Sequence, residues 1–391
     1  MTRRLYHDDA YARTFEADVV AHVAVADRPA IVLDRTAFYP EAGGQLGDRG
    51  TLAGFAVADT QETADGAIAH VIDRTAPPSG GAALPAIGST VHGELDWARR
   101  RQHMAQHTAQ HLLSGALLDR AQAATASARL GETALTIDVT RDRIPEAELA
   151  AAEALANDLI DDYLAIRAWF PDPGELANLK LRRDPKVSAD IRVVAIGDFD
   201  FSPCGGTHCT RTSQLSTIRI IAAERYKGMT RVTFAAARRA RAELFTRDQI
   251  LRGLATQLSC SPGDVAIAID KLRASATAAA DQVTALRGQL AQAIANQLPG
   301  DGAVIATVPG DADLVRGVAA KLAAAGRDAL LYSPEAVVLQ RAAGSLLDCG
   351  ALWKQLATLT GGRGGGRADR AEGRLAGTVD DWPALVARAR T

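Results

Sequence analysis

Two short clusters of histidine and cysteine constrain this chain more than any other feature of its sequence. The first is His107-Thr108-Ala109-Gln110-His111, and the second is Cys204-Gly205-Gly206-Thr207-His208. Residues four apart on a helix project from nearly the same face, so both imidazoles of the first cluster can reach one ion. The two glycines of the second cluster let the backbone bend so that a thiolate and an imidazole converge. Together the clusters offer three nitrogens and one sulfur, a donor set that suits Zn²⁺ at about 2.0–2.3 Å.

The role of such a metal stays open at this point. Either pair alone is a weak signal, because histidine pairs on exposed helix faces arise by chance. Two pairs in one chain are a much stronger indication of a metal site. A closed shell of four protein ligands is typical of a structural zinc, whereas a catalytic zinc keeps one position for water or substrate.

Composition and charge narrow the class of protein. The formal net charge of −2 over 391 residues excludes a uniformly basic nucleic-acid coat, but not a local basic face. No window approaches 18 uninterrupted apolar residues, so no membrane span is expected. The first residues lack the apolar run of a signal peptide, and four cysteines do not make a disulfide framework. These features predict a globular protein of the cytoplasm.

The pattern of the chain predicts four parts. Residues 1–95 contain short β-branched runs separated by Gly- and Pro-rich turns, including a loop at 77–81, which favours a small β-barrel or sandwich. Residues 96–240 combine helices at 96–119 and 145–161 with strand-like runs at 163–170, 191–196, 217–222 and 232–234. This second part is therefore expected to be an α+β domain.

The remaining residues predict a helical spacer and a small final domain. Residues 237–297 are rich in Ala, Leu, Gln and Arg, with one strong interruption at 259–263, and their apolar spacing is not a strict heptad. We therefore expect two helices, with a spacer over residues 241–300. Residues 301–391 contain a strand at 303–308, a helix at 311–325, a strand at 329–332 and a helix at 347–359, typical of a small α/β domain.

One glycine-rich segment carries unusual side chains. Residues 34–48 place a hydroxyl, two aromatic rings, a carboxylate and an amide around closely spaced glycines. Glycines expose backbone N–H groups and permit close approach of a ligand. From composition alone, however, an ordinary turn of the barrel is the better explanation of the segment.

Three motifs in this order resemble one known family. They are Phe-Tyr-Pro-Glu-x-Gly-Gly-Gln at 38–45, His-Thr-Ala-x-His-Leu-Leu at 107–113, and Ser-Pro-Cys-Gly-Gly-Thr-His at 202–208. The chain resembles a free-standing alanyl-tRNA editing protein of the AlaX type, in its long form, and the editing half of alanyl-tRNA synthetase. The glycine-rich run at 361–367 is similar to the C-terminal domain of the same synthetases. The resemblance implies a small N-terminal β-barrel, a two-layer α+β zinc-binding editing domain at 96–240, a helical spacer and a small C-terminal α/β domain at 301–391 that binds tRNA.

The resemblance also implies roles for individual residues. The zinc ligands would be His107, His111, Cys204 and His208. Substrate would be bound by Thr36, Gly43, Gly44 and Gln45, with Thr36 as the reader of the serine side chain and Gln45 near the aminoacyl group. Thr36 and Gln45 are thus the candidate catalytic residues. Arg363 and Arg367 would contact tRNA phosphates.

Two departures from the family pattern stand out. The family usually has three consecutive glycines before the motif glutamine, where this chain has Ala42, Gly43 and Gly44. After the zinc loop the family usually shows Thr-Gly-Glu-Ile-Gly, where residues 212–216 are Thr-Ser-Gln-Leu-Ser. Neither departure touches an expected ligand.

The expected function is deacylation of mischarged tRNA(Ala) in trans at a zinc site. The expected substrate is chiefly Ser-tRNA(Ala), with Gly-tRNA(Ala) as a second candidate and a metal-bound water or a tRNA hydroxyl as the source of base catalysis. Two alternatives remain. They are a tRNA-binding module with a structural zinc, and a zinc hydrolase that acts on another aminoacyl ester. A homodimer through the spacer or the C-terminal domain is a further expectation, and no membrane partner is expected.

Overall fold

The computed structural model describes residues 1–75, 83–185 and 187–391, so the loop predicted at 77–81 lies outside the described residues. The mixed α+β class is confirmed. The chain divides into two compact units, Met1–Ile250 and Leu251–Thr391, which are described separately below. The four predicted domains are a finer division than this and stay a prediction. In the described part of the chain, no helix is long and apolar enough to span a bilayer.

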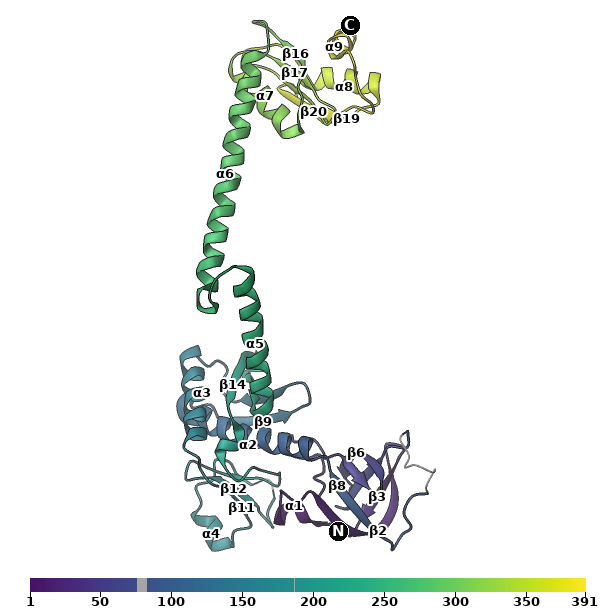
Figure 1. Cartoon of the computed structure of the whole chain (residues 1–391), viewed down its shortest axis with the longest axis vertical. Helices are drawn as coiled ribbons and strands as arrows, with labels where there is room; N and C mark the ends of the chain where they lie inside the picture. The colour runs from purple at the N-terminus through teal and green to yellow at the C-terminus, as the bar shows by residue number, and fades with distance from the viewer. Residues whose placement is uncertain (76–82, 186) are drawn as a thin grey trace. The chain divides into compact units, whose positions relative to one another are not determined.

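Six strands near the N-terminus close into a barrel in the order β2, β3, β7, β6, β5, β8 (Figure 1). They are β2 (Thr14–Val25), β3 (Arg28–Leu33), β5 (Gly50–Leu52), β6 (Phe55–Glu62), β7 (Ile68–Ile72) and β8 (Thr90–Leu95). Exposed and buried residues alternate along the first half of β2, as expected for a strand with one face on a core. Strand β1 (Arg3–Arg4), followed by helix α1 (Leu5–Asp8), pairs in parallel with β4 (Arg35–Thr36).

Helix α2 (Trp97–Ala121) leads from the barrel into the second part of this unit (Figure 1). It begins where the sequence predicts, because the Asp96 carboxylate accepts a hydrogen bond from the backbone N–H of Arg99 and caps the first turn. Every residue from His103 to Leu117 is buried, so the helix is covered on all sides. Buried polar side chains need partners, and this requirement shapes the site described below.

Two antiparallel sheets surround α2. One has the order β14, β15, β10, β9, and the other has the order β11, β12, β13. Their strands are β9 (Thr125–Leu130), β10 (Leu135–Val139), β11 (Ile166–Trp169), β12 (Val193–Ile196), β13 (Asp200–Pro203), β14 (Ile218–Tyr226) and β15 (Met229–Ala236). Helices α3 (Glu146–Asp161) and α4 (Pro173–Asn178) and a 3₁₀ turn, η1 (Thr212–Leu215), complete the unit. The predicted helices and most predicted strands are present, whereas β9, β10 and β13 were not predicted.

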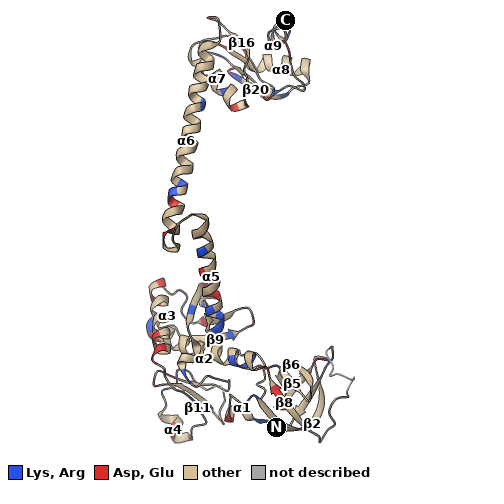
Figure 2. Ribbon diagram, viewed as in Figure 1, with Lys and Arg blue, Asp and Glu red and all other residues tan. Residues whose placement is uncertain are grey.

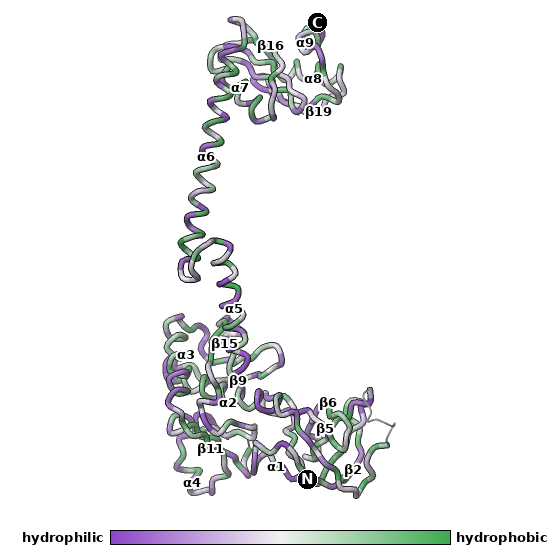
Figure 3. Tube along the Cα trace, viewed as in Figure 1, coloured by the Kyte–Doolittle hydropathy of each residue, from purple (hydrophilic) through white to green (hydrophobic). Residues whose placement is uncertain are grey.

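The helical region after β15 matches its prediction. Helix α5 (Ala237–Gln257) is followed by a 3₁₀ turn, η2 (Pro262–Asp264), and by α6 (Val265–Gln297). Hydrophobic residues recur along α6 (Figure 3), and several are more than half exposed, among them Leu272 and Leu286.

The second unit ends in a five-stranded sheet of order β16, β17, β18, β20, β19. Its elements are β16 (Val304–Thr307), α7 (Ala312–Ala324), β17 (Ala329–Tyr332), β18 (Val337–Gln340), α8 (Cys349–Thr360), β19 (Arg363–Gly366), β20 (Arg370–Arg374) and α9 (Trp382–Arg390). Within this sheet, β16 and β17 are parallel, and the other neighbouring strands are antiparallel. The predicted strand–helix–strand–helix series is present. The glycine-rich run, which carried no strand signal, forms the edge strand β19.

Candidate metal centre

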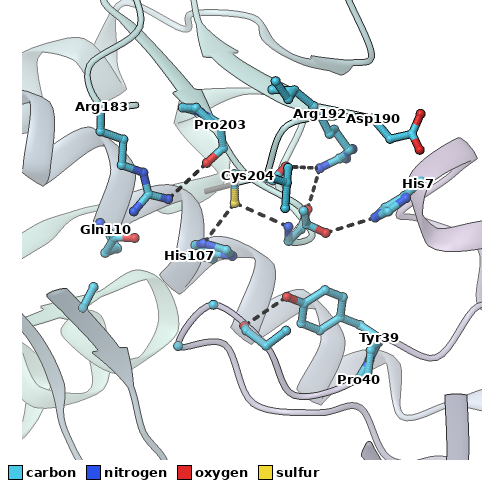
Figure 4. A pocket seen from close by; sticks show the side chains of 18 of the residues that line it. His7, Tyr39, Pro40, His107, Gln110, Arg183, Asp190, Arg192, Pro203 and Cys204 are labelled. Atoms are coloured by element: carbon cyan, nitrogen blue, oxygen red, sulfur yellow. Dashed lines mark hydrogen bonds between the residues drawn. The ribbon is translucent and has the colours of Figure 1, made fainter. Parts of the chain in front are cut away.

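The four predicted metal ligands converge in the structure. Helix α2 presents His107 and His111, and the loop after β13 presents Cys204 and His208. Their ligand atoms all lie within 4.8 Å of one another. The Cys204 Sγ atom is 3.5 Å from His107 Nε2 and 3.4 Å from His208 Nε2 (Figure 4 shows the first pair). Residues 97 apart in the sequence, His107 and Cys204, are therefore direct neighbours.

The other ring nitrogen of each histidine faces an acceptor. His107 Nδ1 donates to Gln45 Oε1 at 2.7 Å, and His208 Nδ1 donates to Thr108 Oγ1 at 3.1 Å. The Thr108 hydroxyl is free to accept because it donates its own proton to the Met104 carbonyl. His111 Nδ1 lies 3.7 Å from the buried Asp200 carboxylate. In the tautomer these partners select, each Nε2 lone pair faces the cluster, as a metal requires.

Burial and charge favour neutral imidazoles at His107 and His208 and a thiolate at Cys204. Burial lowers the pKa of His107, and it lowers the pKa of His208 to about 3, so both rings are neutral. Burial alone would raise the pKa of the Cys204 thiol, but the three imidazoles outweigh it and hold that pKa well below its usual value. For His111, burial is outweighed by Cys204 and Asp200, which raise its pKa. A thiolate among three imidazoles fits Zn²⁺ by charge and by donor type.

The glycine-rich motif places Gln45 beside the metal centre. Gly43 and Gly44 have φ of +58° and +86°, whereas Ala42 is outside the positive-φ region. The alanine that replaces a family glycine is therefore tolerated, because the left-handed backbone falls on the two retained glycines. The Gly44 carbonyl accepts from the N–H of Leu130 at 2.8 Å, which holds the motif against β9. Gln45 itself is fully buried, and its Nε2 donates to Thr207 Oγ1 at 2.8 Å.

Other side chains hold the loop that carries Cys204. Arg192 Nη1 donates to the carbonyls of Cys204 and Gly206, at 3.0 and 2.8 Å (Figure 4). His7 Nε2 donates to the Gly205 carbonyl at 3.1 Å. Sequence reasoning missed both residues, since His7 precedes the first barrel strand and Arg192 stands at the start of a plain hydrophobic strand. Neither position carries a local signal for a contact of this kind.

A buried ion pair, also missed, joins the glycine-rich motif to α2. Arg100 pairs with Asp48 through Nε, at 2.9 Å, and through Nη2, and both side chains are at most 1 % exposed. Arg100 also donates to the carbonyls of Ala10 and Ala37. Asp48 accepts in turn from the N–H of Tyr39 at 2.7 Å. The pair thus anchors the segment that ends in Gln45.

A pocket of about 540 Å³ opens beside the metal centre. His107, Cys204 and Tyr39 line it (Figure 4), and Gly43 and Gly44 line it as well. The volume is in the range typical of small-molecule sites. The structure therefore brings the two motif glycines and two of the four ligands to one cavity.

Thr36 lies outside the lining of this pocket. It is fully buried in the barrel, where its hydroxyl accepts from the N–H of Phe38 at 3.1 Å and donates to His70 Nε2 at 2.8 Å. The direction of the second bond follows because His70 Nδ1 must donate to the carbonyl of Ile31. Neither Thr36 nor Gln45 lines the pocket, so their contact with substrate stays a prediction. Arg363 and Arg367 are exposed at β19 and just after it, in the second unit.

The second departure from the family pattern strains the backbone at Ser216. Ser216, where the family has glycine, adopts φ 62° and ψ −69°, and the N–H of Thr217 donates to the Leu215 carbonyl at 2.7 Å. This is a γ-turn with positive φ, a strained conformation for a residue with a Cβ. The strand β14 still follows it directly, at Ile218.

Replacing Ser216 with glycine should stabilise the N-terminal unit. Relief of strain, typically 1–3 kcal/mol, exceeds the extra entropy of an unfolded glycine, so we expect a net gain of about 1 kcal/mol. Urea unfolding measures this gain. The Ser216→Ala variant keeps the positive φ and should show no gain, and Ser213→Gly, three residues earlier in η1, should lose stability. A loss of stability in Ser216→Gly would mean that the turn is not strained.

Two family models match parts of this chain. Residues 191–233, which include Cys204 and His208, match the threonyl and alanyl tRNA synthetase second additional domain. Residues 7–99, which include the glycine-rich motif, match the class II (A) tRNA synthetases. Sequence families of the aminoacyl-tRNA synthetases thus cover the glycine-rich motif and the loop of Cys204 and His208, whereas His107 and His111 lie between the two matches.

Individual relatives include an editing protein and two alanine–tRNA ligases. The alanyl-tRNA editing protein AlaX-L of Pyrococcus horikoshii is 35% identical over 272 residues, which are 67% of this chain and 64% of that protein. The alanine–tRNA ligases of Thermococcus kodakarensis and Haloquadratum walsbyi are each 33% identical, over 96% and 81% of this chain. The chain spans only 42% and 35% of the length of those two ligases. The resemblance predicted from the three motifs is confirmed: this chain is a relative of alanyl-tRNA editing proteins and of alanine–tRNA ligases.

Proposed function

We propose that this protein is a zinc-dependent hydrolase that removes a wrongly attached amino acid from tRNA(Ala), chiefly serine, with glycine as a second substrate. The single observation that carries the proposal is that the four-donor cluster borders a pocket through two of its members. His107 and Cys204 line that pocket, whereas a structural zinc is enclosed by protein on all sides. The relationship to an editing protein supports the same conclusion.

The chemistry needs an ester held beside the metal ligands. A zinc ion on His107, His111, Cys204 and His208 would supply Lewis acidity toward an ester carbonyl or a water molecule. Gln45, Thr108 and Asp200 orient the three imidazoles, and Arg192 and His7 fix the loop of Cys204. Gly43 and Gly44 also line the pocket and leave room for a close ligand, since neither carries a side chain.

The need for a second site follows from the size of the amino acids. Serine is slightly larger than alanine and glycine is smaller, and one methylene is worth only about 1–3 kcal/mol of discrimination in a binding pocket. A site that hydrogen-bonds the serine hydroxyl penalises alanine, because its own polar group would be left unpaired. We retain Thr36 as the candidate for that group, acting with His70, to which its hydroxyl is bonded.

The proposal is tested by deacylation of three substrates. The purified protein should hydrolyse Ser-tRNA(Ala), hydrolyse Gly-tRNA(Ala) to a lesser or equal extent, and spare Ala-tRNA(Ala). Elemental analysis should find about one zinc per chain, and Cys204→Ala should lose both zinc and activity. Binding of tRNA(Ala) with zinc present but no hydrolysis would favour a binding module with a structural zinc. Equal hydrolysis of a seryl ester that lacks tRNA would favour a hydrolase for other esters.

Thr36→Val tests the proposed reader of serine. The substitution keeps the volume of the side chain and removes its hydroxyl. We expect the ratio of seryl to alanyl deacylation to fall about fivefold or more, since a lost hydrogen bond is worth about 1–3 kcal/mol. Zinc content should not change. If seryl and alanyl activities fell together, Thr36 would support the barrel and His70 and would not select the substrate.

The tRNA partner is also a proposal. Arg363 and Arg367 at the edge strand β19 offer exposed cations for phosphates of tRNA(Ala). A cytoplasmic location and a homodimer stay predictions.

A further inference from the structure

A second pocket, of about 410 Å³, lies where α2 and α5 begin, next to η1. Three arginines line it: Arg101 from α2, and Arg238 and Arg241 from α5. No carboxylate is among its lining residues. Figure 2 shows the basic residues gathered where α5 begins. In a chain with a net charge of −2, three cations around one cavity are a local concentration of positive charge.

These three guanidinium groups are not used to hold the fold. All three side chains belong to exposed residues, and none has an ion pair or hydrogen bond within residues 1–75, 83–185 and 187–391. Nearby arginines behave differently, since Arg49 and Arg99 share the Glu132 carboxylate at 3.1 Å. Like charges that are held together without counter-charges repel one another, so an anion should bind there.

The walls of the pocket suit a charged and partly flat ligand. Trp97 is half-buried in the wall, and the Arg13 guanidinium lies over its ring, 4.7 Å from the centroid. Arg13 thus adds a fourth cation at this edge. Gln214 uses its Oε1 to accept from Tyr11 and Thr210, which leaves its amide N–H groups as donors at the pocket.

We propose that this pocket binds phosphate groups of the RNA backbone. The inference rests on the proposed function, which requires an RNA substrate at the N-terminal unit. Arg238 and Arg241 are three apart on α5 and so lie on one face of that helix, with Arg101 on the neighbouring helix. The guanidinium fork matches a phosphate with two parallel hydrogen bonds. A series of such cations beside an aromatic ring fits successive phosphates of a polynucleotide, whereas a small anion would need only one of them.

The salt dependence of tRNA binding tests this proposal. We compare the wild-type chain with Arg238→Ala/Arg241→Ala, using uncharged tRNA(Ala) over a range of KCl concentrations. Each lost phosphate contact removes about 0.7–0.9 from the slope of log K against log salt, so the slope should become shallower by about one to two. The dissociation constant at low salt should rise about tenfold or more. Zinc content and the thermal midpoint should not change, because both arginines are exposed.

Three controls test whether the effect depends on the position of the charge, on the guanidinium shape, and on tRNA as the source of the phosphate. Arg74→Ala/Arg143→Ala removes the same charge from exposed residues outside the pocket and should leave the slope unchanged. Arg238→Lys/Arg241→Lys should keep most of the slope but lose part of the affinity. An unchanged slope in the alanine variant would overturn the proposal. Loss of inorganic phosphate binding with intact tRNA binding would also overturn it, in favour of a small-anion site. Because uncharged tRNA is used, a failure of deacylation would bear on the proposed function and not on this result.

Discussion

Replacing Gly206 with alanine should abolish metal binding. A Cβ at this position would lie 2.2 Å from His107 Cε1 and 2.4 Å from His107 Nδ1, well inside contact distance. The ring of His107 must then move, and it would lose its hydrogen bond to Gln45 as well as its place in the cluster. Changes to the partners of metal ligands cost about 10–100-fold in metal affinity, and displacement of a ligand should cost at least the upper figure. Zinc content by elemental analysis and the rate of deacylation measure the effect.

The neighbouring glycine provides a matched control. A Cβ on Gly205 would meet no atom within 4 Å, and Gly205 has no positive φ. Gly205→Ala should therefore keep its zinc and its fold. If both variants kept zinc, the four-ligand cluster would not depend on close approach of the loop to α2, and our description of the centre would be wrong. If both lost it, the loop would need glycine for its flexibility and not for space.

Replacing Arg100 with leucine should cause the largest loss of stability in the N-terminal unit. The substitution leaves the Asp48 carboxylate buried without its counter-charge, and it also leaves the Ala10 and Ala37 carbonyls without their donor. Breaking a buried pair in this way typically costs about 3–5 kcal/mol. Because the chain has two units, urea unfolding should be followed together with zinc release, which identifies the transition of the N-terminal unit.

Two further variants test whether that loss of stability comes from the unpaired buried charge. Arg49→Ala removes one arm of an exposed pair with Glu132 and should cost about 0–1 kcal/mol. Arg100→Leu/Asp48→Leu removes both buried charges, so it should recover part of the stability that the single variant loses. A double variant as unstable as the sum of two single variants would show that the two residues act independently, contrary to the geometry.

Local rules explain which parts of the fold could be predicted. Helix α2 was located because Asp96 caps it and no glycine or proline interrupts before Gly115. Polar and apolar residues alternate in β9 (Thr125–Leu130) and in β10 (Leu135–Val139), and this strand signal was overlooked. They are strands because they pair with each other and with β15, and such pairing is not a property of the segment alone. The strand β19 is a similar case, since β20 supplies its hydrogen bonds.

The metal centre also has parts that the sequence predicted and parts that it could not predict. The spacing of His107 and His111, and of Cys204 and His208, predicted all four donors, because three intervening residues on a helix or in a Gly-Gly loop decide which side chains can meet. Gln45 was predicted as a residue near substrate, and the structure places its amide on His107. No sequence pattern links these positions, since their contact depends on how the barrel meets α2.

The sequence by itself thus determined the donor set, the longer helices and the family, since each depends on residues close together in the chain or on motifs that can be compared directly. Tertiary structure alone decided which atoms surround the donors. It brought Arg100 to Asp48, His107 to Gln45 and Thr108 to His208. Contacts of this kind join elements separated by tens to hundreds of residues. They form because the burial of α2 on all sides leaves its polar groups no water to bind, so each must find a partner on whichever element packs against it.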